Sequence, residues 1–152
     1  MQLFVDMDGV LADFDTGYEL AFGTRPDKKD DNVDWQAVRA RRGFYENLPP
    51  MPDMPELWAH IEPHRPIVLT GVPWSVEEAP ENKRAWARKN LGLHVEVRCC
   101  RSKEKCLHAQ PGDVLIDDWE KYRHLWIAQG GRWITHRSAA ESIRGLRALG
   151  IS

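Results

Sequence analysis

The sequence predicts a three-layer α/β sandwich built on a five-stranded, mainly parallel sheet. Five short apolar runs recur along the chain, and most are continuous rather than alternating, as in strands that are covered on both faces. Amphipathic helical stretches separate these runs, which predicts a doubly wound sheet with right-handed crossovers. The five runs are Leu3–Val5, Ile67–Leu69, Val95–Val97, Val114–Ile116 and Trp133–Ile134. Val95–Val97 alternates with a charged residue, which is typical of an edge strand.

A long interval follows the first strand, and it predicts a small, mostly helical cap. A helix over about 13–23 is followed by a polar stretch over 25–34 and a short helical piece over 35–41. A structureless loop of this length is unusual in a compact domain. We therefore predict a cap over residues 17–61 inserted into an α/β core formed by residues 1–16 and 62–152.

The remaining helices carry recognisable start and stop signals. Pro80 and Gly92 bracket a helix over 80–91, and a helix over 119–129 stops at the glycine pair 130–131. Ser138 and Glu141 form a capping box before a last helix, and Asp53 with Glu56 resembles another.

Composition bounds the class of protein. The 152 residues carry 21 Lys and Arg against 23 Asp and Glu, and 42% are apolar, as in a folded single domain. The net charge of −2 argues against a partner that is a nucleic acid polymer or a membrane surface. No apolar run approaches the ~20 residues of a membrane span, and the first residues lead directly into a strand. We expect a cytoplasmic protein without a signal peptide.

Three cysteines, Cys99, Cys100 and Cys106, predict reduced and at least half-buried thiols. A zinc site with His94 and His108 is the alternative, but adjacent cysteines lack the usual spacing of structural zinc ligands.

Polar residues follow three of the predicted strands. Asp6 and Asp8 follow the first, Thr70-Gly71 the second, and Asp117-Asp118 the fourth. Each group alone could be a turn or a helix cap. Because ligands of open α/β sheets bind at the carboxyl ends of the strands, their joint placement predicts one site.

Four carboxylates at one edge repel one another unless a cation lies between them, and oxygen ligands favour Mg²⁺. A phosphate can then approach the metal, and an aspartate can attack its phosphorus to form an acyl phosphate. A second carboxyl group can protonate the departing oxygen and later accept a proton from water.

These residues resemble the four motifs of the haloacid dehalogenase (HAD) superfamily. The segments DMDGVLADF, GFYENLPPMP, LTG, KRAW and DVLIDDW are similar to its 5′(3′)-deoxyribonucleotidase branch and to small bacterial and phage relatives of that branch. The resemblance covers nearly the whole chain and implies a HAD-like, Rossmann-type core.

The resemblance also implies roles. Asp6 is expected to be the nucleophile and a Mg²⁺ ligand, and Asp8 the general acid/base, with its carbonyl on the metal. Asp118 is expected to bind Mg²⁺ directly, and Asp117 through water or from a second layer. Thr70, the Gly71 N–H and a lysine are expected to hold the phosphate.

Three lysines are candidates for that phosphate-holding role: Lys83, Lys103 and Lys105. Lys105 falls where the third motif is expected, and Lys83 is predicted to reach the outer rim or the distal part of the substrate. The chain departs from the branch at Thr70-Gly71, where Thr-Ser is usual, so one hydroxyl donor is missing.

Aromatic residues in the cap are candidates for contact with a base. Phe44 and Tyr45 match base-contacting positions of the branch, and Trp35 lies nearby. Stacking on a base and packing in the core of the cap are both open. Packing is the better interpretation for Trp35 and stacking for Phe44.

The resemblance thus implies a Mg²⁺-dependent phosphomonoesterase that acts on nucleoside monophosphates through an aspartyl phosphate. Hydrolysis of another small ester, such as a sugar phosphate, is the alternative. A non-catalytic metal-binding module of the same fold is a further one, which the intact Asp6 and Asp8 disfavour.

Overall fold

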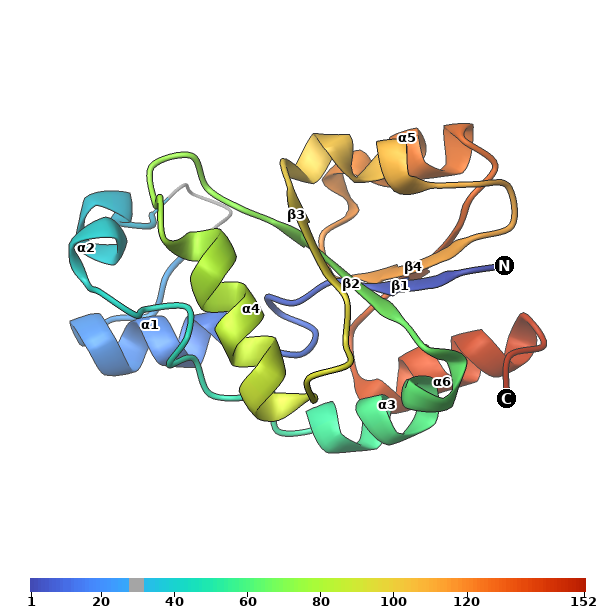
Figure 1. Ribbon diagram of the computed structural model, residues 1–152, viewed down its shortest axis with the longest axis horizontal. Helices are drawn as coiled ribbons and strands as arrows, with labels where there is room; N and C mark the ends of the chain where they lie inside the picture. The colour runs from blue at the N-terminus through green and yellow to red at the C-terminus, as the bar shows by residue number, and fades with distance from the viewer. Residues whose placement is uncertain (28–31) are drawn as a thin grey trace.

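The computed structural model describes residues 1–27 and 32–152 and shows five parallel strands in the order β3-β2-β1-β4-β5 (Figure 1). The strands are β1 (Leu3–Val5), β2 (Ile67–Gly71), β3 (Val97–Cys100), β4 (Val114–Asp117) and β5 (Arg132–Thr135). All neighbouring strands pair in parallel, which confirms the predicted fold class and makes the sheet wholly rather than mainly parallel.

Helical segments cover both faces of the sheet. The helices are α1 (Phe14–Phe22), α2 (Trp35–Ala40), α3 (Met54–Ile61), α4 (Ala79–Asn90), α5 (Arg123–Ala128) and α6 (Ala139–Ala148). Three short 3₁₀ segments, η1 (Glu62–His64), η2 (Ser102–His108) and η3 (Glu120–Tyr122), complete the described elements.

The alternation of side chains along β1 divides the core into two layers. Leu3 and Val5 pack in the cluster that also contains residues of α3, α4 and α6. Phe4 points to the other face, where its ring lies edge-on to Trp126 of α5 at 5.5 Å. Every residue of β1 is therefore buried, as the continuous apolar run predicts.

The edge strand lies slightly later in the chain than predicted. The expected strand was Val95–Val97, whereas β3 begins at Val97 and continues to Cys100. The backbone explains the shift, because Val97 is the residue that pairs with Val68 and only the Glu96 carbonyl accepts a bond before it.

Two helix starts that look alike in sequence differ in structure. The Ser138 hydroxyl accepts a bond from the Glu141 N–H at 3.2 Å, as predicted. Asp53 does not cap its own helix. Its Oδ2 instead accepts a bond from the Ala139 N–H at 2.7 Å, at the first turn of α6. The carboxylate at the start of α3 thus stabilises a helix distant in sequence.

The segment that we predict to be a cap lies at the carboxyl edge of the sheet, beyond the ends of the strands (Figure 1). It contains α1 and α2, while residues 28–31 of the predicted polar stretch lie outside the described residues. The expected range 17–61 also includes α3, yet α3 packs beside α6 under the sheet. We therefore assign α3 to the core layer, which makes the proposed cap shorter.

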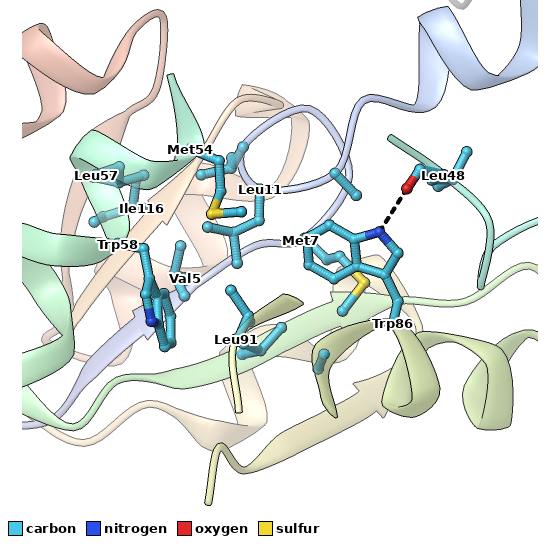
Figure 2. Packing of buried hydrophobic residues seen from close by; sticks show 14 of the residues in the cluster. Val5, Met7, Leu11, Leu48, Met54, Leu57, Trp58, Trp86, Leu91 and Ile116 are labelled. Atoms are coloured by element: carbon cyan, nitrogen blue, oxygen red, sulfur yellow. Dashed lines mark hydrogen bonds between the residues drawn. The ribbon is translucent and has the colours of Figure 1, made fainter. Parts of the chain in front are cut away.

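The segment between the cap and α3 is fastened to α4. The Trp86 indole N–H donates to the Leu48 carbonyl at 2.8 Å, and its ring is fully buried near Met7 (Figure 2). This bond satisfies the one polar atom of a large buried ring and fixes the cap segment to the core.

In the described part of the chain, no helix is long and apolar enough to cross a membrane.

Candidate active site

The loop after β1 places two carboxylates at the end of the central strand. The Asp6 N–H donates to the Ile116 carbonyl and continues the β1–β4 ladder. The Met7 carbonyl then accepts bonds from the N–H groups of residues 10, 11 and 12, which folds the chain into a tight loop. Asp6 and Asp8 are held at a fixed strand end as a result.

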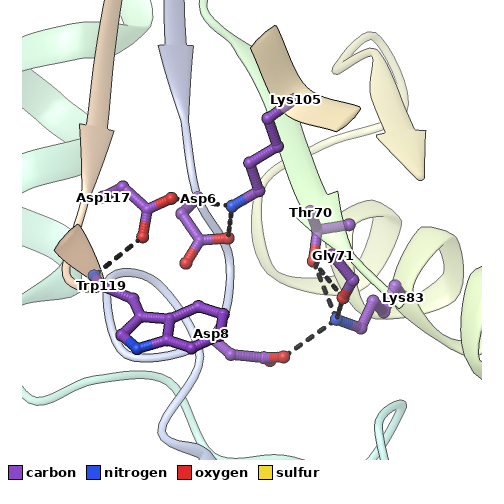
Figure 3. A network of polar contacts seen from close by, with 8 residues as sticks. All are labelled: Asp6, Asp8, Thr70, Gly71, Lys83, Lys105, Asp117 and Trp119. Carbon is purple, nitrogen blue, oxygen red and sulfur yellow. Dashed lines mark hydrogen bonds and ion pairs between the residues drawn. The ribbon is translucent and has the colours of Figure 1, made fainter. Parts of the chain in front are cut away.

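Lys105 connects the first carboxylate with the end of β4 (Figure 3). Its ammonium group donates to Asp6 Oδ1 at 2.9 Å and to Asp117 Oδ2 at 2.8 Å. All three residues are buried. Lys103, the neighbouring candidate, is exposed. Of the two lysines before β4, Lys105 is therefore the one that contacts the predicted nucleophile.

Lys83 contacts the second carboxylate, which corrects the expectation that it reaches the rim. It is fully buried on α4, and its ammonium group donates to Asp8 Oδ2 at 2.9 Å. It also donates to Thr70 Oγ1 and to the Gly71 carbonyl, both at 2.8 Å. The sequence predicts the helix correctly, but the inward direction of this side chain depends on how α4 packs.

Burial and charge shift the protonation of the buried pair. Burial, and then the charge of Asp117, raises the pKa of Asp6 although Lys105 opposes the change. Burial lowers the pKa of Lys105, but its ion pairs with Asp6 and Asp117 outweigh that effect and leave the pKa raised. This ammonium therefore stays charged between the two carboxylates.

Three carboxylates come close enough to hold one cation. Asp6, Asp117 and Asp118 each offer an oxygen, and these atoms lie within 4.8 Å of one another. Both oxygens of Asp117 already accept bonds, from Lys105 and from the Trp119 N–H. Asp118 is the exposed member of the group. This arrangement agrees with direct binding by Asp118 and a more distant role for Asp117.

The charges of the site fit a divalent cation. Four aspartates, at positions 6, 8, 117 and 118, face two buried lysines, which leaves a formal charge of −2. Oxygen donors of this kind suit Mg²⁺.

Gly9 provides the space that Asp118 occupies. Its φ is +82°, and a Cβ built there would lie 2.1 Å from Asp118 Oδ2. A side chain at position 9 would therefore be strained and would displace a candidate metal ligand. Sequence reasoning did not assign Gly9 a role, although glycine directly after Asp-x-Asp is a visible signal.

Ser102 explains why glycine follows Thr70. A Cβ at Gly71 would lie 2.3 Å from Ser102 Oγ, so the serine hydroxyl fills the space of the missing side chain. Thr70 is fully buried, and its hydroxyl accepts from Lys83 while its own contact with the Gly71 carbonyl is long, at 3.5 Å. Its hydrogen is thus available to another acceptor.

The cap aromatics are placed differently from expectation. Phe44 and Tyr45 are 5% and 2% exposed, whereas Trp35 is 36% exposed. The Phe44 ring packs on Phe14 and Phe22. The relative burial of Phe44 and Trp35 is thus the reverse of the expected one, because Phe44 packs in the main core cluster. Contact of either ring with a base stays a prediction. The centroid of the Tyr45 ring lies 4.7 Å from the Lys83 ammonium nitrogen, so this ring covers the buried lysine.

A surface cavity of about 770 Å³ lies between α1 and residues 41–49. None of the site carboxylates or lysines lines it, so its size does not make it the active site. The three cysteines are half-buried and form no disulfide. Burial raises the pKa of Cys100 to about 11, which disfavours a reactive thiolate there.

Comparisons with known proteins agree with this architecture. No protein-family model matches the chain. Proteins from Bordetella bronchiseptica and Bordetella pertussis, both provisionally named 5′(3′)-deoxyribonucleotidase, are 28% identical over 145 residues. Each alignment covers 78% of this chain and 74% of the relative. Among solved structures, an L-2-haloacid dehalogenase from Xanthobacter autotrophicus matches with a TM-score of 0.53 at 14% identity. That match covers 99% of this chain and 84% of the other, and it shows the fold.

Proposed function

We propose that this chain is a phosphomonoesterase of the haloacid dehalogenase superfamily and that it works through an aspartyl phosphate on Asp6. The observation that carries the proposal is the separation of the two strand-end carboxylates. Asp6 is paired with Lys105, while Asp8 is paired with Lys83 through one oxygen only. One carboxylate is thus kept as a nucleophile and the other is oriented for proton transfer.

In the first step, an Asp6 carboxylate oxygen forms a bond to phosphorus as the bond to the departing oxygen breaks. Asp8 donates its proton to that oxygen, and an alcohol leaves. Asp8 Oδ1 is buried and has no hydrogen-bond partner within residues 1–27 and 32–152. Lys83 fixes the other oxygen, so this one is available to the substrate.

In the second step, Asp8 takes a proton from water, and the resulting hydroxide attacks the phosphorus. The bond to Asp6 breaks, which releases phosphate and restores both carboxyl groups. Lys105, the Thr70 hydroxyl and the Gly71 N–H would bind the phosphoryl oxygens on which negative charge develops.

Mg²⁺ would be held by Asp6 and Asp118, with Asp117 behind them and the Asp8 carbonyl beside them. When bound, it would neutralise phosphoryl charge and allow the anion to approach Asp6.

Nucleoside monophosphates are the proposed substrates, in line with the names of the Bordetella relatives. A sugar phosphate is the second candidate, and the burial of Phe44 and Tyr45 favours it, because these rings offer no free face to a base. Asp6 and Asp8 are both present and ordered within charged networks, which argues against a non-catalytic module.

The test is phosphate release from thymidine monophosphate and from deoxyribose 5-phosphate, with Mg²⁺ and with EDTA. We expect turnover that EDTA abolishes and Mg²⁺ restores. Asp6→Asn should lower kcat by roughly 10⁴-fold or more, as loss of a nucleophile does.

Asp13→Asn is the matched control. Asp13 caps α1 by accepting from the Thr16 N–H at 3.1 Å, and asparagine caps equally well, so this variant should keep its activity. Comparable turnover by the Asp6→Asn variant would exclude the covalent route.

A further inference from the structure

If the proposed function holds, the group that leaves the phosphate lies on the Asp8 side of the site. Asp8 must reach the departing oxygen, and its carboxylate points toward Lys83 on α4 (Figure 3). Residues 72–78 connect Gly71 with α4 and therefore border this side. This loop is therefore a candidate contact for the departing group.

Trp74 is an exposed aromatic residue in this loop. It is 73% exposed, and the Arg101 guanidinium lies over its ring at 3.6 Å from the centroid. The Val72 N–H donates to the Cys100 carbonyl at 2.9 Å, which ties the start of the loop to the end of β3. Arg101 directly precedes η2, the segment that carries Lys105. Trp74 and Arg101 thus lie near the ends of β2 and β3. Thr70 lies at the end of the first of these strands, and Lys105 follows the second.

The loop is also fixed from the cap side. Glu78 Oε1 accepts a bond from the Gly43 N–H at 2.9 Å, next to the buried Phe44. The loop therefore lies between cap and core, and its position depends on both. The contact with Arg101 holds the exposed indole in one orientation and leaves its other face available for stacking.

We propose that the base of the nucleoside monophosphate stacks on Trp74, with Arg101 holding the indole from its other face. A guanidinium on one face of an indole leaves the opposite face open, and its charge favours contact with the π-system. Stacking on an aromatic ring is tolerant of base identity. The proposal rests on the proposed function, and it supplies the base contact that the buried Phe44 and Tyr45 do not provide.

Trp119 is the natural comparison. It is 52% exposed at the same edge of the sheet. Its backbone N–H donates to Asp117 Oδ1, on the side of the candidate metal ligands. Its ring contacts Lys121 and Tyr122 rather than residues of the 72–78 loop. Trp119 is therefore the alternative base contact at this edge, and the experiment below distinguishes it from Trp74.

The experiment measures binding in the Asp6→Asn background by calorimetry, so that turnover is not needed. The two probes are thymidine monophosphate and deoxyribose 5-phosphate, which share the sugar and phosphate and differ in the base. Trp74→Ala should weaken binding of thymidine monophosphate by about 5- to 100-fold and leave deoxyribose 5-phosphate within twofold. Trp74→Phe should retain most of the affinity. Arg101→Gln should cause a smaller loss with the same dependence on the base.

Trp119→Ala should leave the ratio of the two affinities unchanged. The proposal is overturned if Trp74→Ala weakens both probes equally, if it weakens neither, or if Trp119→Ala is the variant that removes the preference. It is also overturned if the base adds no affinity before any change at position 74. Absence of turnover in the unmodified protein would instead refute the proposed function, and this binding comparison remains a separate measurement.

Discussion

Lys105 and Lys83 are both buried at the candidate active site, yet they have different partners. Lys105 lies between two carboxylates, those of Asp6 and Asp117. Lys83 has one carboxylate partner, Asp8, and its other two bonds go to a hydroxyl and a carbonyl. The first lysine therefore balances charge between the predicted nucleophile and the metal side. The second orients the predicted acid and the hydroxyl that faces the phosphate.

This difference shows how one sheet edge can keep two nearby aspartates in separate roles. Burial raises the pKa of Asp6, and the Lys105 ammonium opposes that change by favouring the ionised form that a nucleophile needs. Within the described residues, Asp8 Oδ1 has no hydrogen-bond partner, because Lys83 binds the other oxygen. The two ammonium groups come from different elements, η2 and α4, and each binds a different aspartate. Variants of the residues around these two lysines test that difference.

Lys105→Met should lower kcat by about 10²-fold or more, because it removes a cation placed at the transferring phosphoryl group. The loss should be similar for p-nitrophenyl phosphate and for an alkyl phosphate, since the lysine acts on the phosphoryl group that both share. Steady-state kinetics on the two esters measure this. Lys103→Met is the control, and because Lys103 is exposed it should behave as the unmodified protein. A Lys105 variant with near-normal kcat would place the third motif elsewhere.

Lys83→Met should lower kcat by roughly tenfold or more on the alkyl phosphate and distinctly less on p-nitrophenyl phosphate. General acid catalysis is worth about 10²- to 10⁴-fold when the departing oxygen needs a proton, and nitrophenolate needs it least. The ratio of the two losses separates a lysine that positions Asp8 from one that binds phosphate. An effect confined to KM on both esters would restore the original expectation of a distal contact.

Gly9→Ala and Gly23→Ala separate backbone strain from displacement of Asp118. Both glycines have φ near +80°. A Cβ at Gly23 would have nothing within 4 Å, whereas a Cβ at Gly9 would collide with the carboxylate of Asp118. Each variant should lose about 1 kcal/mol of stability from the strained backbone. Only Gly9→Ala should also raise the Mg²⁺ concentration needed for half-maximal activity, by about tenfold if one ligand is displaced.

Titrating that concentration in both variants measures the difference. An equal requirement for Mg²⁺ in the two would remove Asp118 from the proposed set of metal ligands.

Asp6→Asn should change the pH dependence of stability in the presence of EDTA. Burial first, and then Asp117, raises the pKa of Asp6 above its ordinary value of 3.8. A carboxyl group with a raised pKa binds its proton more tightly in the folded state, so its ionisation costs stability as the pH rises through that window. The asparagine variant lacks this cost.

Its free energy of unfolding, relative to the unmodified protein, should therefore increase as the pH rises above 3.8 and level off above the raised pKa. Urea unfolding at a series of pH values tests this. A relative stability that stays flat or falls across the series would contradict the burial argument.

Several features depend on local sequence and were predicted from it. The continuous apolar runs predict strands buried on both faces, and the sheet contains all five near the expected positions. Ser138 caps α6 through a residue three positions on, which is a contact within one turn. Asp6 and Asp8 follow β1, while Thr70 and Asp117 lie at the carboxyl ends of β2 and β4. The carboxyl ends of parallel strands meet at one edge whatever the details of packing.

Other features depend on contacts between distant segments. Asp53 resembles a cap for its own helix but accepts from Ala139, because α3 and α6 lie side by side. Phe44 resembles a base-contacting residue but is enclosed by Phe14 and Phe22. In both cases the sequence signal describes the residue correctly and leaves its partner open.

By itself, the sequence determined which polar residues lie at the end of each strand. It places carboxylates at the ends of the first and fourth strands, a hydroxyl at the end of the second, and lysines before the fourth. These positions follow from periodicity and capping, which act over a few residues. Only the tertiary structure decided that Lys83 meets Asp8 and that Lys105 meets Asp6. A long side chain on a helix or a 3₁₀ turn can point to several neighbours, and the packing of that element against the sheet selects one. The assignment of acid and nucleophile to their cations is therefore a property of the fold rather than of either motif.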